Sequence, residues 1–560
     1  MKDFVKKLWE MKYTRRTLIS VTVGSAFAFL LFYIFLPPIN LRSVGFWVYR
    51  AVVALAYSLP FFNIKFNSFV EIKKDVNGKI IKKARGGEIN KWALLPTASV
   101  VAVLLIGLII SSTLFNARRY AAIIEVQRYD FSEDMKESEE ITHIALMDTE
   151  SAMMLGNRTL GELSNTSAIS QYTVSEAYTQ INYKNTPKKV SNLEYDGFFK
   201  WIANSKNGIP GYVMVDPVKS SSEFVSLTAP MTYAESAYFH QDLERKLRFD
   251  YPTKIFESIS FEVDDENNPY YIVSCSTPTV GLFGASDISE VIIFDPTSGE
   301  SELVDVSSVP QWIDIVYTGD LATEKYNWYG TLSGGFINSV IGNVDCTQST
   351  DDFGYIALED DVWYFTGVTS AVSDDLSNIG FILTNARTGE YKFYPVIGAE
   401  EHSAMAAAEG EVQEKGYVAS FPSLVNIAGE ATYIMVLKDA SGLVKLYALV
   451  NVENYSIVAT GENQTEAMKE YKRLLRANGI ESDGAEDTAL TRDIEVHNLR
   501  DVTISGNSYV YIRVGNELYR GSVADDETLL FITVGSKITV TYTESDTEGI
   551  YIITSWEPKE

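Results

Sequence analysis

Three long runs of apolar residues stand near the start of the chain, at positions 17–36, 44–62 and 93–114. The first and third runs contain no charged side chain, and the second contains only Arg50. About 20 helical residues, at 1.5 Å each, cross the ~30 Å hydrocarbon layer of a membrane. The pattern therefore predicts three transmembrane helices. For residues 44–62 a re-entrant or interfacial helix stays an open alternative, although Arg50 lies close enough to one end to reach the head groups.

Positive charge is concentrated in two segments beside these runs. The tail 1–16 holds six Lys or Arg residues, and the loop 63–91 holds eight. The positive-inside rule places both segments in the cytoplasm, which requires that residues 44–62 cross the membrane. Residues 1–115 carry a net charge of +11, whereas the rest of the chain carries −38. We therefore expect a multi-pass protein of the cell membrane whose large C-terminal part, from residue 116 onward, is extracytoplasmic.

Beyond a membrane-proximal region at 116–200, one pattern recurs across residues 201–479. An apolar strand, a polar turn and a second strand surround each of four residues: Asp216, Asp295, Asn385 and Asn451. Asp and Asn side chains can bind their own backbone two residues further on, which is typical of tight turns. Earlier strands at 270–275, 362–365 and 432–437 extend three of these units. The pattern predicts repeated antiparallel sheets, each covered on one face by a helix, in an α+β fold.

Helices are predicted after the second, third and fourth units. Residues 310–317 form a short candidate, and residues 398–413 form an alanine-rich one. The third starts with Asn463 and Glu466, which have the spacing of a capping box, and it ends at Gly479.

The end of the chain has a different pattern. Residues 480–487 are polar and acidic, which predicts a linker. Short strands then recur through residues 488–560, among them 529–534, and they predict a small β-barrel of the OB or SH3 type. Some OB folds bind nucleic acid, but residues 490–560 hold 12 Asp or Glu against 6 Lys or Arg. A phosphate backbone would be repelled, so we expect no nucleic-acid partner.

Two resemblances follow from these patterns. A strand pair closed by a D-P-x-[ST]-G-E turn, as at 295–300, resembles the PepSY-like modules of bacterial envelope proteins. Segments such as IALMDTESAMMLGNRTLGEL (144–163) and GFILTNARTGE (380–390) resemble a group of multi-pass bacterial membrane proteins without an assigned activity. The resemblance implies a location in the cell envelope and an α+β fold, and it transfers no catalytic residue.

Catalytic motifs give little support for an enzyme. The four histidines, His143, His240, His402 and His497, have no His or Cys neighbour at ligand spacing, and the common hydrolase and nucleotide-binding motifs are missing. His402, beside two glutamates, is the one histidine of interest, with a surface or packing role as the alternative. The cysteines leave open a disulfide or two free thiols; these are Cys275 and Cys346.

An acidic turn provides the main metal candidate, and Glu359, Asp360 and Asp361 form a similar case. Glu262, Asp264, Asp265 and Asn267 could offer oxygen ligands to Ca²⁺, with an ordinary hairpin turn as the alternative. No other cofactor is expected.

Exposed aromatic residues are the predicted contacts for a partner, with core packing as the alternative for each. The candidates are Trp312, Tyr326, Trp328, Tyr329, Trp363 and Tyr364. Together these patterns favour a membrane-anchored extracytoplasmic binding or scaffold protein of the bacterial cell envelope. Its expected partners are the lipid bilayer, an envelope protein, a wall polymer or a second copy of itself. An envelope enzyme acting on glycan or peptide, and a regulator or inhibitor of a membrane-associated protease, are the alternatives.

Overall fold

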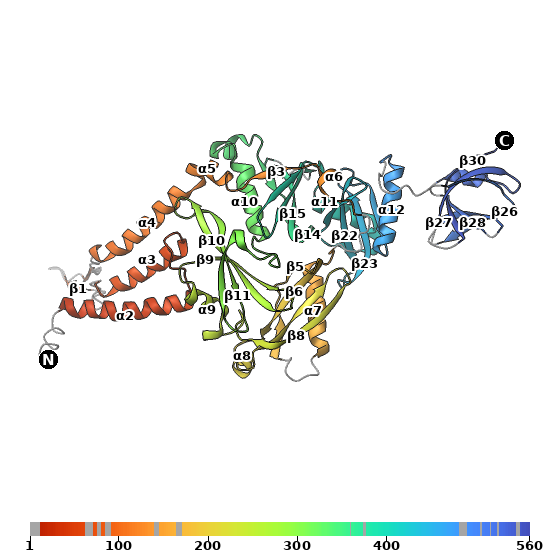
Figure 1. The fold of residues 1–560 in the computed structure, drawn as a ribbon. Coiled ribbons are helices and arrows are strands. Elements are labelled where there is room, and N and C mark those ends of the chain that lie inside the picture. The colour runs from red at the N-terminus through yellow and green to blue at the C-terminus, as the bar shows by residue number, and fades with distance from the viewer. Residues whose placement is uncertain are drawn as a thin grey trace. The chain divides into compact units, whose positions relative to one another are not determined.

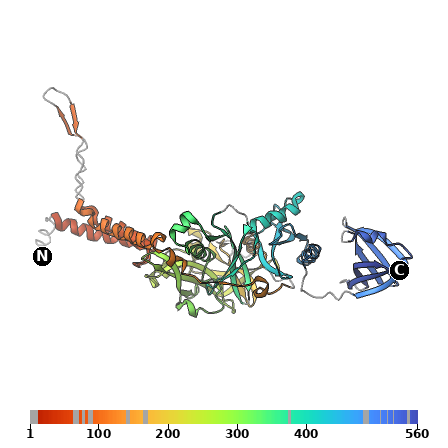
Figure 2. The ribbon, with the colours of Figure 1, turned by 90° about the horizontal axis from the view of Figure 1, so that it is seen from above.

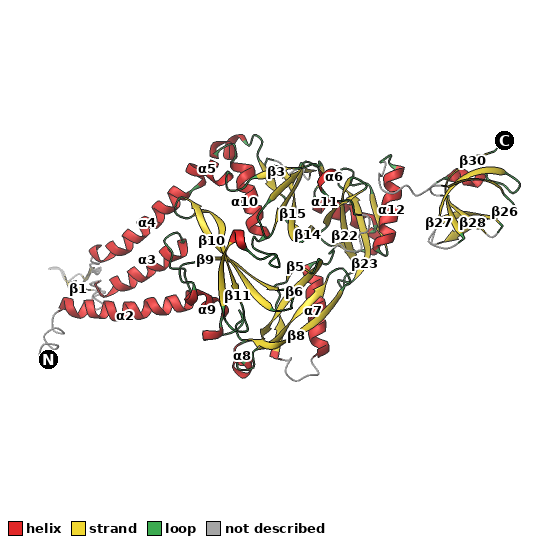
Figure 3. Ribbon diagram, viewed as in Figure 1, coloured by secondary structure: helices red, strands yellow, loops and turns green. Residues whose placement is uncertain are grey.

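The chain divides into two compact units, Met1–Asn478 and Gly479–Glu560. The computed structural model describes residues 12–61, 71–74, 80–83, 91–138, 145–163, 171–358, 360–372, 377–480, 490–504, 507–515, 517–523, 526–544 and 549–559. In the first unit, helices occupy the N-terminal part, and strands make up most of the region from β3 (Val126–Arg128) to α12 (Gln464–Ala477), which we call the body (Figure 3).

Three helices precede the body: α2 (Lys12–Phe35), α3 (Val44–Ser58) and α4 (Leu95–Ser111). With their flanking turns they form apolar helical stretches of 22, 18 and 20 residues, long and apolar enough to cross a membrane. α3 packs against both α2 and α4 (Figures 1 and 2). The three predicted helices are therefore confirmed as candidate spans, including the segment 44–62. The Arg50 guanidinium lies 5.4 Å from the ring centres of Phe46 and Trp47, toward the first turn of α3.

Most of the basic loop 63–91 lies outside the described residues. Two short strands of that loop are described, β1 (Glu71–Lys74) and β2 (Ile80–Lys83), and they pair antiparallel as a hairpin. The tail 1–11 and most of the linker, 481–489, also fall outside the described part of the chain.

The body contains four antiparallel meanders, each of four strands paired in chain order. The first contains β5 (Thr179–Tyr183), β6 (Thr186–Tyr195), β7 (Ile209–Asp216) and β8 (Ser221–Met231). The second contains β9 (Ile255–Val263), β10 (Pro269–Val280), β11 (Gly284–Phe294) and β12 (Ser301–Asp305). The third contains β14 (Gly354–Leu358), β15 (Asp361–Ser370), β17 (Gly380–Asn385) and β18 (Tyr391–Tyr394). The fourth contains β21 (Ser423–Ile427), β22 (Glu430–Lys438), β23 (Val444–Asn451) and β24 (Val458–Gly461).

Each meander turns between its third and fourth strands at one of the predicted Asp or Asn residues. The Asp216 carboxylate accepts the backbone N–H of Lys219 at 2.8 Å, and the Asp295 carboxylate accepts that of Thr297 at 2.7 Å. The side chains of Asn385 and Asn451 accept backbone N–H groups in the same way. The repetition predicted from the sequence is therefore present, with one strand more than predicted in the second, third and fourth units and two more in the first.

Of the three helices predicted to follow the repeated units of the body, two are confirmed and one is wrong. α11 (Glu401–Glu411) lies within 398–413, and α12 begins after Asn463, whose side chain accepts the Glu466 N–H at 2.9 Å. Residues 310–317 are not helical. They form an irregular segment, and the helix starts only at α10 (Gly319–Leu332), capped by the Thr318 hydroxyl.

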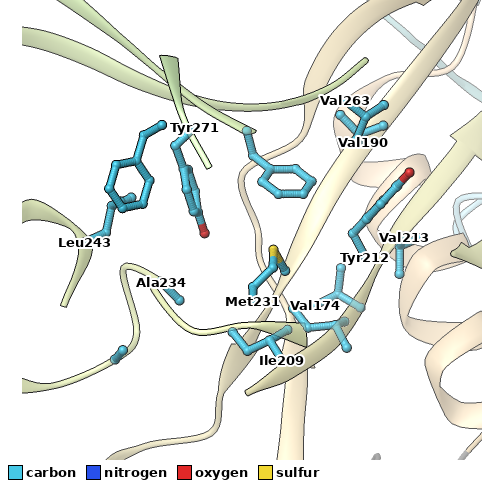
Figure 4. Packing of buried hydrophobic residues seen from close by; sticks show 14 of the residues in the cluster. Val174, Val190, Ile209, Tyr212, Val213, Met231, Ala234, Leu243, Val263 and Tyr271 are labelled. Carbon is cyan, nitrogen blue, oxygen red and sulfur yellow. The ribbon is translucent and has the colours of Figure 1, made fainter. Parts of the chain in front are cut away.

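The meanders pack in pairs. Side chains of the first and second meanders share one interior, which contains Tyr212 and Met231 of the first and Tyr271 of the second (Figure 4). The third and fourth meanders share a second core with α11. The irregular segment 310–318 and α10 lie between the two pairs. In the irregular segment, Val316 packs against the second meander, whereas Ile315 packs against the third.

The C-terminal unit is a single curved sheet with its own core. Its strands are β25 (Leu490–Glu495), β26 (Asn498–Ile504), β27 (Asn507–Val514), β28 (Glu517–Ser522), β29 (Lys537–Glu544) and β30 (Ile550–Pro558). They follow the order β25-β29-β30-β28-β27-β26, with β28 and β30 parallel and the other pairs antiparallel. The predicted strand 529–534 is wrong: the chain there forms a 3-10 turn, Glu527–Phe531, capped by the Asp526 side chain, which accepts the N–H of Thr528.

A chain that ends at Asn478 should keep the cooperative melting transition of the first unit, because each unit buries a separate apolar core. Residues 479–560 expressed alone should also melt cooperatively. The measurement is a thermal melt followed by circular dichroism, with the intact protein in detergent as the reference. Loss of the transition in the truncated chain would show that the two units depend on each other.

Candidate functional site

A cavity of about 340 Å³ lies in the body where three of the four meanders meet. The first meander contributes Gln180, the third contributes β14 and the start of β15, and the fourth contributes residues 423–425 of β21. The segment 134–138 closes a further side. Its volume is within the range of about 300–1,000 Å³ that is typical of small-molecule sites.

The charged residues that line this cavity are an ion pair of a lysine and an aspartate, together with Lys136 and Glu137. The Lys392 ammonium lies 3.0 Å from the Asp134 carboxylate, and the Tyr394 hydroxyl donates to the same carboxylate. The ammonium also lies 5.3 Å from the ring centre of Trp363 and 4.8 Å from that of Tyr129. A cation held between a carboxylate and two aromatic faces is fixed in position, which suits it to orient a polar ligand.

The segment that follows Asp134 is attached to the edge of β21. The Asn426 side chain donates to the Met135 carbonyl at 2.6 Å, and the Ser138 N–H donates to the Asn426 carbonyl at 2.8 Å. The Glu137 carboxylate accepts the N–H of Ala428 at 3.1 Å. These bonds occupy strand-edge groups and hold the wall of the cavity in place.

Lys189 is buried immediately behind the cavity. It pairs with Gln180 in the ladder between β5 and β6, and its ammonium lies 5.4 Å from the ring centre of Tyr355, which lines the cavity. Burial lowers the pKa of Lys189 to about 8, against the opposing attraction of Asp148. This lysine therefore loses its proton more readily than a surface lysine does.

Two buried carboxyl groups lie at the centre of the body but are not among the cavity-lining residues. The Glu262 carboxylate accepts the N–H groups of Asp314 and Ile315 at 2.8 and 3.1 Å, and the Asp314 carboxylate accepts the N–H of Asn182 at 2.7 Å. Burial raises the pKa of Glu262 to about 7. Burial and the nearby Glu262 raise the pKa of Asp314 as well.

The residues predicted to bind Ca²⁺ do not converge on one point. Glu262 is on β9 and binds backbone N–H groups of the 310–318 segment, whereas the Asp264 carboxylate accepts the N–H groups of Glu266 and Asn268 within its own turn. The Asn267 side-chain oxygen accepts the Tyr183 hydroxyl, and no contact of the Asp265 side chain joins it to the others. Within the described residues, no group of three or more His, Cys, Asp or Glu side chains could hold a metal ion.

The predicted aromatic contacts are largely packed inside the body. Tyr326, Trp363 and Tyr364 are buried, and Trp312, Trp328 and Tyr329 are half-buried. Trp312 packs on Tyr270, and Trp328 packs on Tyr120. Of the six, only Trp363 lines the cavity.

Cys275 and Cys346 are both buried free thiols, so they form no disulfide with each other. Cys346 is covered by α10 and donates to the Thr331 carbonyl. Burial raises the pKa of the Cys275 thiol to about 12, which makes it a poor nucleophile. His402 is half exposed and lies 3.6 Å from the Asp352 carboxylate, away from the cavity-lining residues.

Comparison with models of known protein families and with curated proteins finds no match to this chain. The function must therefore be judged from the geometry of the cavity and of the groups around it.

Replacing Glu262 with Gln should lower the free energy of unfolding by about 1–3 kcal/mol at pH 5, because one amide oxygen cannot accept both N–H groups. The wild type should lose part of this advantage as pH rises from about 4.5 to about 7. In that window folded Glu262 keeps a proton that the unfolded chain has released, so deprotonation favours unfolding. The measurement is the difference in denaturant stability between wild type and Glu262→Gln across pH 5–8.

The matched control is Glu302→Gln, the same change on the exposed face of β12. It should change stability little at any pH. An advantage of the wild type over Glu262→Gln that grows with pH would contradict a raised pKa at Glu262.

Proposed function

We propose that this protein is a membrane-anchored binding protein of the bacterial cell envelope that holds a small ligand in the cavity between its meanders. The observation that carries the proposal is the cavity itself, whose walls come from three meanders and whose charged group is fixed before any ligand arrives. A site with ordered polar groups loses little conformational entropy on binding, so its contacts contribute more to affinity. The buried carboxyl groups of Glu262 and Asp314 already accept backbone N–H groups, which favours a binding function over catalysis by these carboxylates.

The composition of the cavity wall indicates the class of ligand. Ile356, Leu358, Leu424 and Trp363 provide an apolar surface, and Lys392 provides a fixed positive charge beside it. A molecule with an apolar part and a carboxylate or similar anion would satisfy both. Fragments of the envelope polymer, which carry sugar, amide and carboxylate groups, have this chemistry.

The proposed location rests on charge and on the three candidate spans. Fourteen Lys or Arg residues in 1–16 and 63–91 support a cytoplasmic position for both segments, so that α4 leads to an extracytoplasmic body. The resemblance of residues 144–163 and 380–390 to multi-pass bacterial membrane proteins supports the same location.

The finer architecture belongs to the proposal as well. Helices follow the second, third and fourth meanders, as α10, α11 and α12 do, which supports a relation to PepSY-like modules. In the C-terminal unit, β25 and β26 are two halves of one bent stretch, of which the first pairs with β29 and the second with β27. A first strand shared by two sides of a barrel is typical of OB folds, which supports a second binding module there.

Lys392→Met should weaken the binding of a soluble wall fragment, such as an N-acetylmuramyl dipeptide, by about tenfold, because a charge-assisted hydrogen bond contributes about 1.5–3 kcal/mol. The measurement is isothermal titration of the full chain in nanodiscs. Lys445→Met is the matched control, since Lys445 pairs with Asp439 on the exposed surface and is not a cavity-lining residue. Equal losses in the two variants, or no saturable binding by the wild type, would contradict the site; release of cleaved product would favour the enzyme alternative.

Protease added to intact cells stripped of their wall should digest the body and leave an epitope inserted into the loop 63–91 intact, because the membrane shields the cytoplasmic side. The measurement is immunoblotting of both regions, with detergent-permeabilised cells as the control in which both are digested. Digestion of the loop and protection of the body would reverse the proposed orientation.

A further inference from the structure

A short turn after α10 holds four large aliphatic side chains out of the body. Ile337, Val340, Ile341 and Val344 are all strongly exposed, and Ile341 is 80% exposed. The turn is well ordered, because the Asn338 side chain donates to the Val344 carbonyl at 2.8 Å and accepts its N–H at 3.1 Å. The structure therefore fixes these apolar side chains outward instead of folding them inward. Monomeric soluble proteins seldom expose contiguous apolar patches of this kind without a partner.

This turn is attached to the end of a candidate membrane span. α4 ends at Ser111, and α5 (Thr113–Ala121) follows it. The Tyr120 hydroxyl donates to the Ser111 carbonyl at 2.7 Å, and the Tyr120 ring lies 5.1 Å from that of Trp328 on α10. Leu332 on the last turn of α10 is buried in the same cluster. The apolar turn thus begins where α10 rests on the helix that leaves the membrane.

The body also contacts the candidate span α4 directly. Ser111 accepts, through its hydroxyl oxygen, the N–H groups of Leu282 and Phe283 at the tip of the β10–β11 hairpin, at 2.8 and 2.9 Å. The Phe283 ring lies so close to Gly107, one turn inside α4, that a Cβ on this glycine would overlap it. The membrane surface therefore lies at the foot of the body and not at a distance from it.

A second apolar patch is attached to α2. Phe239, Phe249 and two residues of α8 (Phe198–Asn204), Phe199 and Ile202, are exposed, and Phe199 is 84% exposed. The Phe249 ring lies 5.7 Å from that of Phe32 in α2. Phe239 has a φ of 56°, a conformation that aromatic residues seldom adopt, and its carbonyl accepts the Arg245 guanidinium.

Two arginines of α9 (Leu243–Asp250) fix this patch to the end of α2. The Arg245 guanidinium lies 4.4 Å from the ring centre of Tyr33, and buried Arg248 donates to the Leu36 carbonyl at 2.8 Å. Figure 1 shows α5 at one side of the helix bundle and α9 at the other. Both patches thus adjoin points at which the body holds a span.

We propose that the two patches, which we call the collar, are embedded in the membrane leaflet on the body's side. The collar comprises Ile337, Val340, Ile341 and Val344 on one side and Phe199, Ile202, Phe239 and Phe249 on the other. Continuity with the spans decides the occupant, because a surface joined to the ends of α2 and α4 meets lipid first. Apolar and aromatic side chains gain free energy at this boundary, where they enter the leaflet by ~5–10 Å. The collar does not depend on the ligand cavity or on which side of the membrane the body lies.

The test uses the full chain in nanodiscs, with the fluorophore NBD attached at Ile341→Cys or at Phe239→Cys. Buried Cys275 and Cys346 give little background labelling. The matched control is Leu443→Cys, at a turn in the fourth meander that is exposed to a similar extent. Lipids with doxyl groups in the upper acyl chain should quench NBD at both collar positions about threefold or more above the control. Melting temperatures of the three labelled proteins show whether each is folded.

Equal quenching at either collar position and at Leu443→Cys would overturn the proposal. So would an NBD label that is exposed to a water-soluble quencher in nanodiscs but shielded in native membranes, since that result identifies a protein partner. Loss of ligand binding by Lys392→Met with quenching retained would separate the two sites.

Discussion

Two carboxyl groups that water cannot reach hold the centre of the body together. Glu262 of the second meander accepts two N–H groups of the irregular segment 310–318, and Asp314 of that segment accepts an N–H of the first meander. Because this segment has no strand beside it to bind these N–H groups, it would otherwise carry unpaired buried donors, each of which costs roughly 1–3 kcal/mol. The carboxyl groups in turn are kept in the interior by their backbone donors, although their own burial is unfavourable. The segment separates the two pairs of meanders, so the walls of the cavity are positioned relative to each other through it.

Local chemistry explains what the sequence could predict. The spans follow from uncharged runs of the right length, and the turns at Asp216, Asp295, Asn385 and Asn451 follow from side chains that bind their own backbone. α12 was predictable because the two residues of its capping box, Asn463 and Glu466, lie within four positions of the sequence. α10 was not, because GDLATEKYNWYGTL has weak helix formers and no clear apolar stripe. Its helical state depends on burial between the second and third meanders, which no local pattern contains.

The candidate site was beyond prediction for a related reason. Asp134 and Lys392 are separated by 258 positions, and they meet because β3, shortly before Asp134, pairs with β18, which carries Lys392. Sequence reasoning chose aromatic residues instead, and of these Trp363 alone reaches the cavity. Glu262 was chosen as a calcium ligand because it begins an acidic run, but strand β9 extends through Val263 and turns this side chain inward. The alternation of β9 places Glu262 on the face of Ser260 and opposite Phe261, but it does not show which face is buried until the partner sheet is known.

The way in which the body is held has a mechanical consequence. The second meander meets the candidate spans at Ser111, the last residue of α4. Arg248 of α9, the helix that follows the first meander, meets them at a separate point, the end of α2. One attachment would let the body swivel, whereas two on different helices restrict rotation about either. Separation would break the hydrogen bond from Arg248 to the Leu36 carbonyl and the two hydrogen bonds that the Ser111 hydroxyl oxygen accepts, so both attachments resist opening. The cavity, in contrast, is lined mainly by the third and fourth meanders, which contact the spans less directly.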